Sequence, residues 1–432
     1  MTTPLDREKD RIRAVTRLLH QACKPIRILR AIDWAPEVKE SFLAGGSREL
    51  PRVTYPPFDP TPSIELVREA RRLIVPFTTI DMWLERHAQS IELGARMLAA
   101  VGTPSFFEFG RQLYGEPTAP LRYVPITPLE LAKSVLETIS QLDQIEISTA
   151  PPAYHSAETV AVDLEHAVRT HFGDQAPAIE LVDRLSANAL ATSRAIKVRR
   201  SARFTDRDFT QLLHHEAFIH VATSLNGKAQ TDLPLLAAGH PGTTRTQEGL
   251  AVFAEVISGS IELDRLRRLA DRVLAIQMAI EGADFLEVNG FFLERTGDPD
   301  QAFESTRRVF RGGVITGGAP FCKDLVYLLG LLQVNNIIRA AFAAGRADCL
   351  SLLFCGKLDT FDIPALCELY AMGLCRAPRF LPPWISDPRY LLAILTFSAF
   401  INRMNLETLT DVARRVLDSA PLVRMPGPEA AS

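Results

Sequence analysis

The 432-residue sequence lacks the marks of several protein classes. Its six cysteines form no Cys-x-x-Cys pair, so we expect reduced core residues rather than a cysteine metal or redox site. The longest apolar runs, 390–401 and 325–334, fall short of the roughly 20 residues that cross a membrane. We therefore expect two buried core helices and no membrane partner.

An excess of charge of one sign is also missing. The 48 Lys and Arg residues face 51 Asp and Glu residues, and the net charge of −3 excludes the basic field of a nucleic-acid-binding protein. The charged N-terminus has no apolar signal-peptide core, so we expect a cytoplasmic location. Gly356-Lys357 lacks the rest of a phosphate-binding loop, which leaves nucleotide binding without support.

Most of the sequence has apolar residues at helical spacing, and a short central segment has a different pattern. Proline-rich residues 51–62 predict an extended connector, and 63–142 repeat apolar residues at helical spacing. The segments ETVAVDLEHAV and ATSRAIKVRRSARF are rich in β-branched residues and predict a small sheet. The expected fold class is α+β, mostly α, with a small central sheet flanked by helical lobes.

Five regions follow from this pattern. We expect an N-terminal helical extension with its connector, a helical lobe, a catalytic core, a C-terminal helical lobe and a disordered tail. Their boundaries are 1–62, 63–150, 151–345, 346–420 and 421–432.

Histidines are few, nine in all, yet His214, His215, His220 and His240 fall within 27 residues. The run HHEAFIH resembles the HExxH zinc motif with one extra residue, and Glu216 follows the first ligand candidate. Histidines five positions apart lie about 140° apart on a regular α-helix, too far to share one ion. We therefore expect a π-type turn between His215 and His220, and we expect His214 to lie on the wrong face.

Capping residues predict that this run lies on a helix. Thr205 with Asp208 forms a loose capping box, and Asn226-Gly227 supplies a stop signal, so a helix of about twenty residues is expected.

A catalytic zinc site has three protein ligands and an open position, so a third ligand is expected downstream. Thr244 and Gln247 form a capping-box pair that would place Glu248 in the first turn of a second helix. Gly249 beside it would let another helix or the ion come close. Glu255, two turns on, is either a competing ligand or a hydrogen-bonding partner of a ligating histidine.

This set of residues favours amide hydrolysis. Two neutral imidazoles and one carboxylate would leave one Zn²⁺ positive enough to acidify its water, and Glu216 would accept the proton and pass it to a leaving amine. The alternative is that the His-Glu pairs are ordinary packed or solvated residues of a helix.

The same motifs resemble a known family. HHEAFIHV, LNGKAQ and above all TRTQEGLAV are similar to the bacterial flavohaemoglobin expression-modulating QEGLA motif proteins, which are related to the microtubule-associated tyrosine carboxypeptidases. The resemblance covers about 24–400 and implies a zincin-like fold, one Zn²⁺ and metallocarboxypeptidase chemistry. It implies His215, His220 and Glu248 as ligands and Glu216 as the catalytic acid and base. A Gly-rich insertion precedes Lys323 and departs from the family pattern.

The substrate side is less defined by the sequence. Arg245, Arg311 and Lys323 are candidates for binding a terminal carboxylate, and Tyr327 or His240 could donate a hydrogen bond to the oxyanion. The strand expected at 195–198 could pair with the substrate as an edge strand, or it could lie inside the sheet. An aromatic terminal residue, Tyr or Phe, is implied only by the resemblance.

The sequence thus predicts a zinc carboxypeptidase that removes a C-terminal residue from a peptide or protein. Two alternatives stay open: a non-catalytic metal-binding regulatory protein, and a zinc hydrolase of a small amide or amino-acid conjugate. The intact Glu216 argues against the first, and the shape of the pocket would separate the second.

Overall fold

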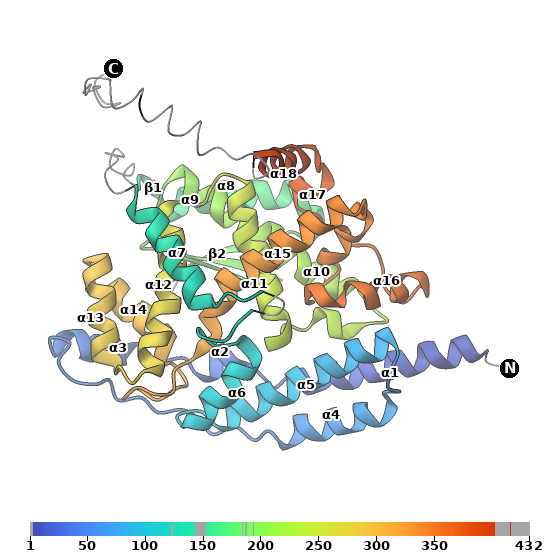
Figure 1. Cartoon of the computed structure of the whole chain (residues 1–432), viewed down its shortest axis with the longest axis horizontal. Coiled ribbons are helices and arrows are strands. Elements are labelled where there is room, and N and C mark those ends of the chain that lie inside the picture. The colour runs from blue at the N-terminus through green and yellow to red at the C-terminus, as the bar shows by residue number, and fades with distance from the viewer. Residues whose placement is uncertain are drawn as a thin grey trace.

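The computed structural model describes residues 3–121, 124–142, 153–183, 185, 188–192, 194–401 and 415, and it is mostly helical with two small sheets (Figure 1). The disordered tail expected at 421–432 lies outside these residues. The first helices are α1 (Pro4–Cys23), α2 (Ile28–Ala31), α3 (Pro36–Ala44), α4 (Thr61–Leu73), α5 (Thr79–Ala99), α6 (Pro104–Tyr114) and α7 (Pro128–Ser140).

The middle of the chain holds all the described strands. They are β1 (His155–Ser156), β2 (Ala178–Val182), β3 (Ala189–Ala191), β4 (Ala195–Arg199) and β5 (Arg203–Phe204). The helices around them are α8 (Ala157–Phe172), α9 (Asp206–Leu212), a π-helix (Leu213–Val221) and α10 (Ala222–Ala229).

Helices return in the rest of the chain. They are α11 (Pro241–Ile257), α12 (Leu263–Ile280), α13 (Phe285–Thr296), α14 (Pro299–Phe310), α15 (Leu325–Ala343), α16 (Ile363–Ala371), α17 (Pro383–Ser386) and α18 (Arg389–Ile401). Short 3₁₀ turns occur at Gly173–Gln175, Pro234–Ala237, Cys322–Asp324, Ala347–Cys349, Ser351–Phe354 and Thr360–Asp362.

Several local predictions are confirmed. Residues 51–60 form an extended connector without helix or strand before α4. Thr205 caps α9: its hydroxyl accepts a hydrogen bond from the Asp208 amide at 3.1 Å, and the Asp208 carboxylate accepts one from the Thr205 amide. The stop expected at Asn226-Gly227 is wrong, because α10 continues to Ala229. A side chain at Gly227 would strike the backbone of Leu236, so the glycine serves close packing instead.

The expected central sheet exists, but half of its predicted sequence is helical. β4 lies in the middle of a three-stranded sheet, parallel to β2 and antiparallel to β3. The segment ETVAVDLEHAV belongs to α8, where Val160, Leu164 and Val168 recur at helical spacing and are buried. Ser156 caps this helix by accepting a hydrogen bond from the Thr159 amide. β-branched content misled the prediction because burial against the sheet outweighs intrinsic propensity.

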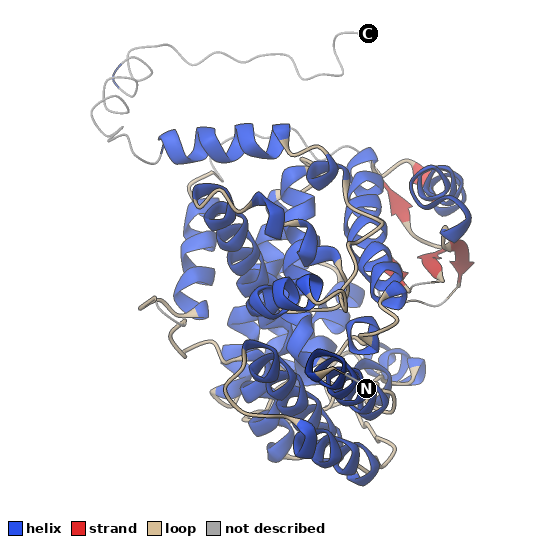
Figure 2. Ribbon diagram, turned by 90° about the vertical axis from the view of Figure 1, so that its right-hand side faces the viewer, coloured by secondary structure: helices blue, strands red, loops and turns tan. Residues whose placement is uncertain are grey.

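Two hydrophobic clusters hold the described residues together. The smaller cluster joins α8, β4, the π-helix and Phe380, and the larger one runs from α1 to α18. Figure 2 shows the strands gathered on one side of a helical body. α11 and α15 cross in the middle of Figure 1, where a side chain at Gly249 would overlap the carbonyl group of Gly330. The close approach expected at Gly249 is therefore confirmed.

The two apolar runs have different environments. Residues 325–330 at the start of α15 are buried, as expected. By length and composition alone, the helical stretch Cys322–Ala343 is long and apolar enough to cross a membrane. The run 390–401 is not a buried core helix: in α18 only Leu391 is buried, and Phe397 is 63% exposed. Apolar composition alone could not show that α18 touches the core with one side. All six thiols are free, and five are buried.

Candidate metal centre and cleft

The HHEAFIH run forms a π-helix, Leu213–Val221, between α9 and α10. This confirms the widened turn that the spacing requires, although it spans nine residues rather than one turn. Hydrogen bonding from residue i to i+5 brings residues five apart onto one face. As a result, the ring centroids of His215 and His220 lie only 5.0 Å apart. His214 packs against Phe218 instead, on a different side of the helix.

Glu248 completes a cluster with these two histidines. Ligand atoms of His215, His220 and Glu248 all lie within 4.8 Å of one another, and His220 Nε2 is 3.9 Å from Glu248 Oε2. Two imidazoles and one carboxylate are a donor set that suits Zn²⁺ with a further position open. The predicted helix start at Thr244 is wrong, because α11 begins at Pro241 and Glu248 lies about two turns inside it.

Glu255 is placed as a partner of His215 rather than as a member of the cluster. Its Oε1 lies 2.7 Å from His215 Nδ1, and it also accepts hydrogen bonds from Gln211 and Arg265. Burial alone would raise the pKa of Glu255, but the hydrogen bond from His215 and the charge of Arg265 lower it to about 2. At neutral pH the ionised Glu255 holds the proton of His215 on Nδ1 and leaves Nε2 facing the cluster.

Glu216 lies beside the cluster and is fixed by the sheet. Its Oε2 accepts a hydrogen bond from the backbone amide of Ala191 in β3 at 2.9 Å, while Oε1 is 4.0 Å from His215 Nε2. Burial raises the pKa of Glu216, and the nearby charge of Glu248 adds to this. A carboxyl group with a raised pKa is suited to both accepting and donating a proton near neutral pH.

Lys323 reaches the cluster despite the Gly-rich insertion before it. Gly312, Gly317 and Gly318 adopt positive φ and fold this loop, and Lys323 follows it in the 3₁₀ turn Cys322–Asp324, directly before α15. The Lys323 ammonium donates a hydrogen bond to Glu248 Oε1 at 3.1 Å. Burial would raise the pKa of Glu248, but the charge of Lys323 leads the opposing effects that bring it to about 2.

The structure does not bring the other predicted substrate residues to the cleft as free donors. Arg245 Nη2 donates to the Tyr114 carbonyl, whereas Arg311 is buried and its Nε has no hydrogen-bond partner among the described residues. The Tyr327 hydroxyl accepts a hydrogen bond from Arg308 at 3.2 Å. None of the three is among the described residues that line the cleft at Glu248, which their positions in the sequence could not show.

His240 caps α11 and belongs to a buried hydrogen-bonded chain. Its Nε2 lies 2.7 Å from His87 Nδ1, whose other nitrogen lies 3.1 Å from Asp362, and its Nδ1 faces Ser90 Oγ at 3.4 Å. Both ring nitrogens are therefore occupied, although the residue borders the cleft. The expected oxyanion donor role does not fit this arrangement.

The cleft beside Glu248 has a volume of about 480 Å³ and a basic lining. Besides Lys323 it includes Arg27 and Arg30 of the N-terminal region and Lys357. Arg27, Arg30 and Lys357 were not predicted as site residues from the sequence, because no spacing links them to HHEAFIH. The two arginines lie in the segment KPIRILRAIDW, almost two hundred residues before the π-helix.

Lys357 donates hydrogen bonds to the end of the π-helix and to its neighbours. Its ammonium donates to the His220 carbonyl, the Thr223 hydroxyl and the Gln247 side-chain oxygen at 2.9 to 3.2 Å. Burial lowers its pKa to about 8. With three acceptors for its three protons, Lys357 orients residues around the cluster rather than offering a free donor to a ligand.

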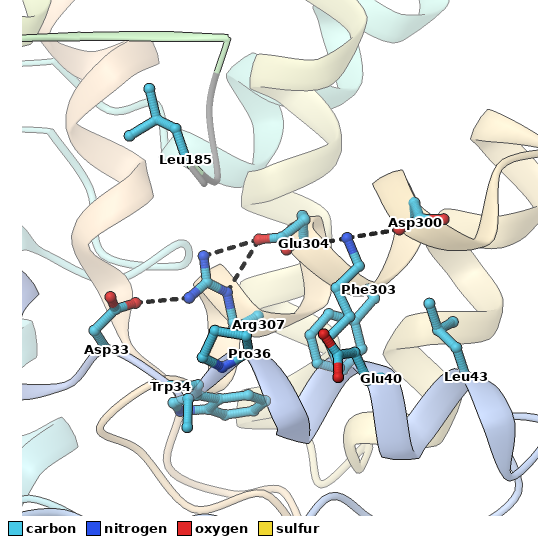
Figure 3. A pocket seen from close by; sticks show the side chains of 12 residues that line it. Asp33, Trp34, Pro36, Glu40, Leu43, Leu185, Asp300, Phe303, Glu304 and Arg307 are labelled. Atoms are coloured by element: carbon cyan, nitrogen blue, oxygen red, sulfur yellow. Dashed lines mark hydrogen bonds and ion pairs between the residues drawn. The ribbon is translucent and has the colours of Figure 1, made fainter. Parts of the chain in front are cut away.

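Another cavity of similar volume, about 500 Å³, lies between α3 and α14 (Figure 3). Three of its carboxylates are engaged in ion pairs: Arg307 binds Asp33 and Glu304, and Lys39 binds Asp300. It shares no lining residue with the cleft at Glu248. Cavity size alone therefore does not identify the candidate active site.

Most of the chain matches one protein-family model. Residues 40–403 match the family model described as "Microtubule-associated tyrosine carboxypeptidase", while curated protein sequences give no match. The matched range contains the π-helix, α11 and the loop that carries Lys323. Because the match covers far more than half of the sequence, the chain belongs to the microtubule-associated tyrosine carboxypeptidase family.

Proposed function

We propose that the protein is a zinc-dependent carboxypeptidase that removes a C-terminal residue, Tyr or Phe, from a peptide or protein. The observation that carries this proposal is the cluster of His215, His220 and Glu248 with Glu216 beside it. Family membership supports a carboxypeptidase activity. The arrangement of paired histidines on a helix next to a small sheet supports a zincin-like core.

Each residue has a defined task in this proposal. His215, His220 and Glu248 would hold Zn²⁺, which when bound supplies a Lewis acid that makes water easier to deprotonate. Glu216 accepts a proton from the attacking water and returns it to the amine nitrogen as the peptide bond breaks. Ala191 holds the Glu216 carboxylate in place, and Glu255 holds His215.

The substrate would bind along β3 rather than β4. β4 is paired on both sides, whereas β3 is an edge strand and its last residue, Ala191, lines the cleft. An extended peptide can pair with such an edge. Lys323, Arg27 and Arg30 give the cleft the positive charge that a terminal carboxylate needs.

Metal analysis combined with a peptide panel tests this proposal. Peptides that differ in their last residue, together with copies bearing a C-terminal amide, would be incubated with the wild type and with Glu216→Gln. We expect one Zn²⁺ per chain in both proteins, and release of a terminal Tyr or Phe only by the wild type and only from free carboxylates. Absence of zinc, or equal release by both proteins, would refute the proposal.

Small amino-acid amides added to the panel separate the carboxypeptidase from its two alternatives. Cleavage of these amides, without any release from peptides, would favour a hydrolase of small conjugates. Bound zinc without hydrolysis of any substrate would favour a regulatory protein. The open cleft with a strand edge along it supports a chain end as the substrate.

A further inference from the structure

A smaller cavity lies between α12, α13 and α14. Its volume is about 190 Å³. Four arginines and two aspartates line it: Arg267, Arg268, Arg272, Arg295, Asp264 and Asp271. It shares none of these residues with the cleft at Glu248.

The two aspartates are already paired within the lining. Asp271 lies 2.9 Å from Arg295, and Asp264 lies 3.3 Å from Arg267. Two of the four arginines, Arg268 and Arg272, are therefore left without an aspartate partner in the lining. Arg268 has no hydrogen bond or ion pair to any other residue that the structure describes.

Arg272 is the more constrained of these two arginines. Its closest carboxylate, Asp324, is 3.6 Å away and is already held by Arg308 in a two-pronged ion pair. The Arg272 guanidinium stacks 5.2 Å from the Tyr327 ring, and Arg308 and Arg265 lie near the same ring. Burial and the repulsion from Arg308 lower its pKa to about 9.

A poorly paired guanidinium with only 14% of its side chain exposed is costly to keep charged. An anion in the cavity would offset this cost, since a phosphate group can accept several guanidinium hydrogen bonds at once. The size is also selective. A water molecule occupies about 30 Å³, and typical pockets for larger ligands begin near 300 Å³, so the cavity has room for a phosphate-sized ion with a few waters.

We propose that this cavity binds a phosphate group, with Arg268 and Arg272 as the principal donors. The site is independent of the proposed peptidase activity. It is linked to the cluster by contact, because Arg272 stacks on Tyr327 and the Lys323 ammonium, which binds Glu248, lies 4.9 Å from the same ring.

Calorimetric titration with sodium phosphate at constant ionic strength tests this site. The full-length protein would be measured untreated and after removal of metal by a chelator, so that phosphate binding at the metal cluster is recognised. We expect one phosphate per chain in both samples. Arg268→Gln and Arg272→Gln should each weaken binding at least tenfold, whereas Arg169→Gln on α8, an exposed arginine paired with Glu165, should change nothing.

Thermal unfolding adds a readout that a purely structural arginine would not give. Phosphate should raise the melting temperature of the wild type. Arg272→Gln should melt higher than the wild type without phosphate, because a buried repulsion is removed, and should no longer respond to phosphate. If Arg272→Gln fails to fold, the exposed Arg268→Gln carries the test.

A parallel titration with glycerol 3-phosphate distinguishes the source of the group. Tighter binding of the ester would indicate a phosphorylated metabolite, and tighter binding of inorganic phosphate would indicate the free ion. The proposal is overturned if phosphate gives no heat, if chloride competes at equal concentration, or if both arginine variants bind like the wild type.

Discussion

The Nδ1 atom of His215 lies 2.7 Å from Oε1 of Glu255, which joins the π-helix to α11 through a buried carboxylate. Glu255 in turn contacts Arg265, so the charge on the carboxylate is balanced inside the protein. The contact decides which nitrogen of His215 carries the proton. We therefore expect Glu255 to influence metal affinity without being a ligand.

Replacing Glu255 with Gln should lower zinc affinity about 10- to 100-fold, because His215 loses the partner that fixes its orientation and basicity. Competition with a chromogenic chelator would measure the affinity. Glu165→Gln, an exposed residue of α8, is the matched control and should bind zinc like the wild type. Unchanged affinity in Glu255→Gln would show that the contact has no role in metal binding.

Glu216→Gln should abolish hydrolysis and at the same time stabilise the metal-free protein. A raised pKa means that the folded state disfavours the ionised form, so ionisation of Glu216 costs stability at neutral pH. Glutamine removes the charge and can still accept the hydrogen bond from Ala191 through its side-chain oxygen. Calorimetry of chelator-treated samples at pH 7.5 would measure the difference. A lower melting temperature for the variant would contradict this account.

Stability in acid should depend on Glu255. Its pKa is about 2 in the folded protein and about 4.5 when unpaired, so its ionisation stabilises the fold above about pH 4.5, and the contribution is lost as the pH falls toward 2. The shift corresponds to about 3 kcal/mol. Urea unfolding of metal-free protein between pH 3 and pH 6 should show a steeper loss of stability for the wild type than for Glu255→Gln. Parallel curves would disprove the assignment.

Gly249→Ala should destabilise the protein by about 3 kcal/mol, since the added methyl group would overlap the Gly330 backbone where α11 meets α15. Gly290→Ala is a suitable control. Gly290 also lies inside a helix, α13, but has open space around it, so alanine should stabilise by up to about 1 kcal/mol. Chemical denaturation of the two variants compares them directly. Equal effects would mean that the helices can move apart at no cost.

Features encoded by neighbouring residues were predictable from the sequence. The Thr205 cap, the π-helix required by the spacing of His215 and His220, and the close approach at Gly249 all follow from local rules, and the structure confirms them. The first two depend on the conformation of a few consecutive residues, and a glycine inside a helix indicates close packing without naming the partner.

Features that depend on distant parts of the chain were not predictable. Lys357 lies more than one hundred residues from the π-helix, and the residues around it do not indicate that its ammonium contacts His220. α8 was mistaken for a strand because its burial against the sheet decides its conformation. The start of α11 was misplaced because His240, a residue with weak capping preference, is held there by its contact with His87.

The carbonyl oxygen of His220 is held from outside the helix by the Lys357 ammonium and from within it by the Ser224 hydroxyl. The widened helix is thus anchored by groups of the protein itself, and an arriving ion has no backbone to rearrange. Most of the entropy lost in ordering the site is then lost during folding, and little remains to be lost on metal uptake. Such a preorganised centre should take up metal at a rate set by diffusion through the cleft.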